Sequence, residues 1–110
     1  MRLADGRELP CSLVVLAIGV APNVALAKAA GLELGTTGGI KTDAHMRTSD
    51  PDIYAAGDCV EVTNRLTGKP MLAPYGDLAN LEGRVAGENA VLGDRTTFPG
   101  SIGSGICKVF

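Results

Sequence analysis

The residues with the clearest capacity for chemistry are a glycine and a carboxylate that follow an apolar run. Ile53-Tyr54-Ala55-Ala56 is followed directly by Gly57 and Asp58. If the run is a buried strand of a parallel α/β sheet, Asp58 lies at its carboxyl end, where such sheets bind ligands. Gly57 permits a sharp turn and close approach of a ligand, and a carboxylate accepts hydrogen bonds from sugar-like hydroxyls. The dipeptide by itself favours a simpler interpretation, a turn that ends a strand.

The other reactive side chains give weaker signals. Cys59 follows Asp58, but the adjacent negative charge disfavours a thiolate, so a buried structural thiol is favoured over a redox role. His45 is the single histidine and has only Asp43 at ligand spacing, which favours a surface loop residue over a metal ligand. Cys11 and Cys107 are expected to be structural. We therefore predict no catalytic residue and no metal ligand in this chain.

Composition restricts the class of protein. The 110 residues suffice for one small domain, and a hydrophobic content of 45% is typical of a folded globular chain. A net charge of −2 without a basic cluster gives no indication of nucleic acid or a membrane surface as partner. Three widely spaced cysteines without a C-x-x-C argue against a disulfide framework or a zinc site. With no signal sequence and no run long enough to span a bilayer, we expect a cytoplasmic protein.

Apolar patterns and turn signals predict the elements that position Asp58. Asp5-Gly6 predicts an N-terminal hairpin. The continuous, β-branched run from Ser12 to Gly19 predicts a strand covered on both faces, as in a parallel sheet. Residues 40–43 and 53–56 predict two shorter strands, and residues 63–74 a polar loop. The expected class is α/β, a partial Rossmann-like fold with parallel strands and a long C-terminal helix.

Two helices are predicted from their boundary residues. Asn23 as N-cap and Gly31 as terminator indicate a short helix that ends near Ala30. A long helix is predicted from Asp77, as N-cap, to about Leu92, followed by a C-cap glycine at position 93.

Small residues form one stripe of the long helix, at positions Ala79, Gly83, Ala86 and Ala90. A glycine inside a helix costs about 1 kcal/mol relative to alanine, so the stripe is expected to contact another backbone or a ligand closely. A large substitution at Gly83 is then expected to disrupt folding or cofactor binding, and a change at Glu82 to be tolerated.

Taken together, these segments resemble a known family. Thr48, the run from Ile53 to Ala56 and the pair Gly57-Asp58 resemble the second flavin motif of the FAD-dependent pyridine nucleotide-disulfide oxidoreductases, which include NADH oxidases, NADH peroxidases and coenzyme A-disulfide reductases. The likeness also covers residues 13–23, 39–43, 46–48 and 79–89. It implies three parts: residues 1–22 as the end of an NAD(P)H-binding domain, 23–95 as the C-terminal segment of an FAD-binding domain, and 96–110 as the truncated start of an interface domain.

The resemblance implies a cofactor site made of Gly57, Asp58, Tyr75, Gly76 and Asp77. Asp58 would accept a hydrogen bond from a ribityl hydroxyl of FAD. The backbone N–H groups of Tyr75, Gly76 and Asp77, at the start of the long helix, would face the pyrimidine edge of the isoalloxazine. A helix N-terminus is partly positive and carries free donors, which suits the negative charge that hydride from NAD(P)H leaves on the flavin.

The implied function is transfer of hydride from NAD(P)H through FAD to a small-molecule acceptor (oxygen, peroxide or a disulfide), in an enzyme that is a homo-oligomer. The chain contains no G-x-G-x-x-G, the loop with which such enzymes hold pyrophosphate, so we expect the chain alone to be inactive. Two alternatives remain open: a standalone module that binds a nucleotide or sugar at Asp58, and a protein-interaction domain.

Overall fold

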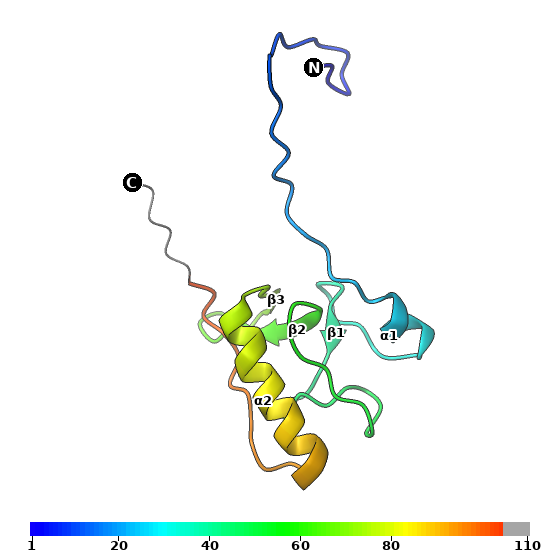
Figure 1. Ribbon diagram of the computed structural model, residues 1–110, viewed down its shortest axis with the longest axis vertical. Helices are drawn as coiled ribbons and strands as arrows, with labels where there is room; N and C mark the ends of the chain where they lie inside the picture. The colour runs from blue at the N-terminus through cyan, green and yellow to red at the C-terminus, as the bar shows by residue number, and fades with distance from the viewer. Residues whose placement is uncertain (105–110) are drawn as a thin grey trace.

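The computed structural model describes residues 1–104. In chain order its elements are α1 (Ala25–Ala29), β1 (Ile40–Lys41), β2 (Val60–Thr63), β3 (Pro70–Leu72) and α2 (Gly76–Leu92). Figure 1 shows α2 beside the three strands, α1 on the far side of β1, and the N-terminal segment extending away from this body. The expectation for Cys107, and that for residues 105–110 of the interface domain, lie outside the described residues.

The three strands form one mixed sheet in the order β1-β2-β3. β1 and β2 are parallel, with Ile40 opposite Val60, whereas β2 and β3 are antiparallel, with Val62 opposite Met71. The α/β class and the parallel pair are therefore confirmed. The β2–β3 hairpin lies in and just before the region that we expected to be a polar loop.

The predicted strand from Ser12 to Gly19 is wrong. This segment is extended but belongs to no strand, and Leu13, Leu16 and Ile18 are 79%, 80% and 90% exposed. A strand is stabilised by hydrogen bonds to neighbouring strands, and no described segment pairs with this one. The hairpin that precedes it is confirmed in minimal form, as a single antiparallel bridge between Arg2 and Glu8.

The predicted strand from Ile53 to Ala56 is also wrong, which changes the setting of Asp58. The run makes one antiparallel bridge, between Tyr54 and Arg47, and the strand begins only at Val60. Gly57 and Asp58 thus precede β2 rather than follow a strand. The physical reason is again pairing, because this run has a backbone neighbour on one side only, the segment from Met46 to Thr48.

Both predicted helices are present. α1 is shorter than expected and its N-cap is Val24, while Gly31 has the left-handed φ of +74° that the sequence predicted. α2 starts after Tyr75, an N-cap in extended conformation, so that Asp77 lies in the first turn rather than at the cap. Gly93 ends α2 with a φ of +76° and donates its N–H to the carbonyl of Asn89.

The inner face of α2 carries two buried polar side chains. Glu82 and Asn89 are each 1% exposed and share this face with Leu78, Val85 and Ala86. The position expected to be packed closely, Gly83, has no atom within 4 Å of where a Cβ would stand. The expectations for positions 82 and 83 are therefore reversed in the described part of the chain.

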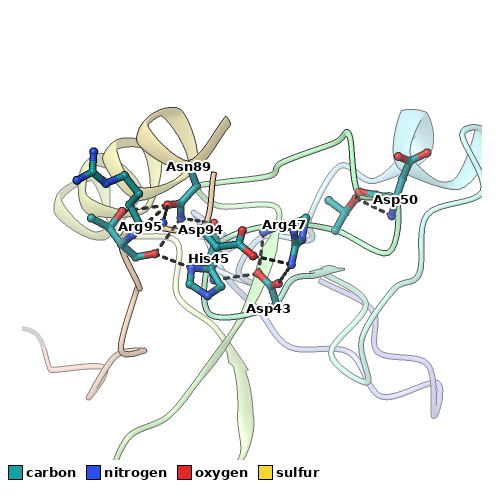
Figure 2. Close-up of polar contacts among 9 residues, drawn as sticks. Asp43, His45, Arg47, Asp50, Asn89, Asp94 and Arg95 are labelled. Carbon is teal, nitrogen blue, oxygen red and sulfur yellow. Dashed lines mark hydrogen bonds and ion pairs between the residues drawn. The ribbon is translucent and has the colours of Figure 1, made fainter. Parts of the chain in front are cut away.

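Asn89 holds the segment that follows α2 against the loop that contains His45, as Figure 2 shows. Its Nδ2 donates to the carbonyls of His45 and Thr96, both at 2.9 Å, and its Oδ1 accepts from the N–H groups of Arg95 (2.9 Å) and Thr96 (3.0 Å). Arg47 adds an ion pair to Asp94 at 3.1 Å. The C-terminal end of α2 is thereby fixed to the body of the protein.

Two clusters of buried apolar side chains form the core. The larger lies between α2 and the sheet and comprises Met46, Val60, Val62, Ala73 and Ala86, and the smaller lies under α1 and comprises Val24, Ala27 and Ile40. Met46 is 1% exposed and has a φ of +65°. Among the described residues it is the one residue other than glycine with a positive φ. Asp43 stabilises this backbone, because its Oδ1 accepts from the N–H groups of both His45 and Arg47.

Candidate functional site

The loop that carries Asp58 is a tight turn held at both ends. Gly57 has a φ of +90°, and its carbonyl accepts the N–H of Val60 at 2.9 Å. The N–H of Gly57 donates to Oε2 of Glu82 at 2.7 Å. A Cβ at position 57 would stand 3.6 Å from the Cβ of Ala79, so the turn packs on α2. Glycine is thus required here chiefly by its backbone conformation, as the sequence predicted.

Asp58 is exposed and lines a cleft of about 590 Å³. The other walls are residues 19–23, Cys59, Leu72 and Pro74, which make the cleft largely apolar. No described residue forms an ion pair or hydrogen bond with the Asp58 carboxylate. A largely apolar cleft with an unpaired carboxylate at its edge is the usual form of a ligand site, and a cleft of several hundred Å³ is a usual size.

The segment that leads into α2 borders this cleft through Pro74, directly before the N-cap Tyr75. Tyr75, Gly76 and Asp77 are exposed, no side chain caps the helix, and the N–H groups of Gly76, Asp77 and Leu78 find no acceptor among the described residues. Tyr75 and Asp77 line a second cleft of about 470 Å³, together with Arg65. Consecutive residues, Pro74 and Tyr75, line the two clefts, so both clefts border the segment that leads into α2.

Of the five residues predicted for the site, Gly57 and Asp58 share one turn and the other three share the start of α2. The structure places the two groups on neighbouring clefts rather than in one. Glu82, which the sequence reasoning missed, joins the turn to the helix. Its burial raises the pKa of the carboxyl group above the ordinary value, the N–H of Gly57 opposes this, and the charge of Asp58 adds to it.

The side chains considered for redox or metal chemistry have structural surroundings. The Cys59 thiol is half-buried, with its sulfur 3.9 Å from the carbonyl oxygen of Ala56. His45 is not a free surface residue, because its Nδ1 lies 2.8 Å from the carbonyl of Thr96 and must carry the proton of that hydrogen bond. Among residues 1–104, no three histidine, cysteine, aspartate or glutamate side chains are placed to hold a metal ion. The described helices include none with both the length and the apolarity that a bilayer span requires.

Comparison with known proteins gives a consistent result. The sequence model of the family described as pyridine nucleotide-disulphide oxidoreductase matches residues 1–76. The chain is 42% identical over 106 residues to the NAD(P)H sulfur oxidoreductase (CoA-dependent) of Pyrococcus furiosus, an alignment that covers 96% of this chain and 24% of that protein. The chain thus spans about a quarter of the length of this curated relative.

Two solved structures have the same fold over nearly all of this chain. An NAD-dependent persulfide reductase from A. fulgidus matches with a TM-score of 0.85 and 55% identity, over 96% of this chain and 20% of that one. A FAD-dependent pyridine nucleotide-disulphide oxidoreductase from Desulfovibrio vulgaris matches with a TM-score of 0.80 and 55% identity, over 93% of this chain and 25% of that one. Because the family match covers more than half of the chain and the fold agrees, this chain belongs to the pyridine nucleotide-disulphide oxidoreductase family.

Proposed function

We propose that this chain is part of a longer FAD-dependent enzyme that transfers hydride from NAD(P)H to a small-molecule acceptor, and that it supplies one portion of the FAD site. The observation that carries the proposal is the unpaired carboxylate of Asp58 in a cleft that is also lined by Pro74, in the segment that leads into the uncapped N-terminus of α2. Its membership of the family, and the FAD dependence named for the Desulfovibrio vulgaris protein, support this choice of cofactor.

The residues present fit a cofactor that has both hydroxyl groups and an electron-accepting ring. Asp58 offers free acceptor oxygens to a ribityl hydroxyl, and a charged acceptor makes such a bond stronger than a neutral one. Gly57 gives the turn the conformation that exposes Asp58.

The start of α2 supplies the complementary donors. The free N–H groups of Gly76 and Asp77, in the segment that follows Tyr75, are oriented along the helix axis and carry its partial positive charge. When bound, FAD supplies a group that accepts hydride from NAD(P)H and passes the electrons on. Donors that are already fixed at a helix N-terminus stabilise negative charge there without reorganising during the reaction.

The remaining features of the proposal concern the whole enzyme. We propose that residues 1–22 end an NAD(P)H-binding domain, that 23–95 complete an FAD-binding domain, and that 96–110 begin an interface domain of a homo-oligomer. The acceptor would be oxygen, peroxide or a disulfide, and the names of the sulfur oxidoreductase and the persulfide reductase among the relatives support a sulfur compound over the other two. We further propose a cytoplasmic location.

The test is FAD binding by the longer protein that contains this chain. Asp58→Ala is expected to weaken FAD binding by about 1.5–3 kcal/mol, the usual contribution of a hydrogen bond to a charged group. Asp52→Ala, which removes an exposed carboxylate from the preceding loop, is the matched control and should bind FAD like the parent. A parent protein that binds no flavin, or an Asp58→Ala variant that retains it as tightly as the control, would contradict the proposal.

A further inference from the structure

We propose that Glu82 is a positioning residue for the FAD site, which fixes the turn of Asp58 relative to α2. This inference rests on the proposed function, since it assigns a role to Glu82 only if Asp58 and the start of α2 hold the same cofactor. Nothing in the sequence pattern of the turn identifies Glu82, which lies 25 residues after Gly57.

The contact is short and buried. Oε2 of Glu82 accepts the N–H of Gly57 at 2.7 Å, and the residue is 1% exposed. Gly57 also packs over Ala79, one helical turn before Glu82 on the same face. The turn is therefore held to α2 by one apolar contact and one hydrogen bond to a carboxylate, and both contacts act at the residue directly before Asp58.

The hydrogen bond between Gly57 and Glu82 determines which polar groups of the turn are available to a ligand. Because the N–H of Gly57 is directed to Glu82 and its carbonyl to Val60, the polar groups of Gly57 are both used inside the protein. Of the turn, the side chain of Asp58 is then left exposed beside the cleft, which Asn23 also lines. Loss of the bond would free the preceding peptide to rotate and would let Asp58 change its position relative to the N–H groups of α2.

A carboxylate is a costly choice for a position whose function is packing alone. An apolar side chain would fill the same space without removing a charge from water, and burial penalises charge strongly. The neighbouring charge of Asp58 adds to this penalty. A role for the acceptor atom explains why an acidic residue occupies a helix face that is otherwise apolar except for Asn89.

The test compares Glu82→Met, which keeps the length but loses the acceptor, with Glu82→Gln, which keeps a carbonyl acceptor. The Kd for FAD is measured by titration of the apoprotein of the longer enzyme, and visible circular dichroism reports the surroundings of the bound flavin. Glu82→Met is expected to raise the Kd by about tenfold or more and to alter the dichroism, whereas Glu82→Gln restores values near those of the parent. Glu88→Met, on the exposed side of α2, is the matched control and should change neither.

A double-mutant cycle distinguishes positioning of Asp58 from a general loss of stability. If Glu82 acts through Asp58, Glu82→Met has a much smaller effect on the Kd in an Asp58→Ala background than in the parent. Independent effects in the cycle, or an unchanged Kd and dichroism for Glu82→Met, would overturn the inference. A parent that binds no FAD instead overturns the proposed function. If Glu82→Met does not fold, hydrogen exchange of the Gly57 amide in the parent is the alternative test. An amide that is not protected from exchange would show that the hydrogen bond to Glu82 is absent and would overturn the inference.

Discussion

Replacing Asn89 by leucine is expected to destabilise the fold. The substitution keeps the approximate volume of the side chain but removes all of its hydrogen bonds at a position that is 1% exposed. Asn89 forms hydrogen bonds with four backbone groups. They belong to His45, in an earlier loop, and to Arg95 and Thr96, in the segment that follows α2.

The structure limits how many of these groups would lose every partner. The N–H of Arg95 also lies 2.7 Å from the carbonyl of Gly93, and the carbonyl of Thr96 also accepts from the His45 ring. The carbonyl of His45 and the N–H of Thr96 have no second partner among the described residues. A polar group that loses its only partner in a buried position costs about 1–3 kcal/mol, so the two together predict a loss of roughly 2–6 kcal/mol in the free energy of unfolding.

Urea unfolding of the 110-residue chain, followed by far-ultraviolet circular dichroism, measures this loss. Asn80→Leu is the matched control, since Asn80 lies on the exposed side of the same helix and, among residues 1–104, its side chain forms a hydrogen bond only with Arg84. Equal midpoints for Asn89→Leu and Asn80→Leu would refute the reasoning, because they would show that the network of Asn89 contributes nothing to stability.

Three further predictions follow from burial and exposure. Gly83→Ala should raise the free energy of unfolding by about 0.5–1 kcal/mol, since position 83 is open and alanine is the better helix former. A loss of stability would contradict this and would indicate that another part of the protein packs closely against position 83. Burial raises the pKa of Glu82 above its ordinary value of 4.5, so its contribution to stability is complete below pH 4.5 and declines as pH rises through the folded pKa; Glu82→Gln should therefore gain stability relative to the parent as pH rises above 4.5 in urea titrations, and a difference that does not change with pH would exclude a buried charge. The exposed apolar side chains from Leu13 to Val20 predict that the 110-residue chain self-associates, so light scattering should show a mass that rises with concentration, and a monomer at every dilution would contradict this.

Local signals predicted the helices well. The end of α2 at Leu92 and the C-cap glycine at position 93 were predicted correctly, because these signals act within the helix itself, whereas the N-cap was predicted at Asp77, two residues after the true N-cap, Tyr75. The strands were predicted poorly, because a strand exists only through its neighbours. Ser12–Gly19 has a strongly β-forming sequence and no described partner, whereas Val60–Thr63 has an alternating pattern of apolar and polar residues that went unrecognised and pairs on both sides.

The candidate site was predicted in part, and for reasons that differ between residues. Asp58 and the start of α2 came from resemblance to a family, and the strand argument first applied to Asp58 was wrong. Glu82 was missed because an acidic residue on a helix normally faces water. Its spacing did contain the signal, since Leu78, Val85 and Ala86 are four residues before, three after and four after it, which places it in the centre of the apolar face.

The left-handed backbone of Met46 restricts what can replace it. A φ of +65° favours glycine or asparagine, whereas the core around the side chain requires a large apolar group. Glycine would suit the backbone and leave a cavity, and leucine or isoleucine would fill the core and keep the backbone under strain. Saturation mutagenesis should therefore find position 46 among the least tolerant in the chain, with no substitution that satisfies both requirements.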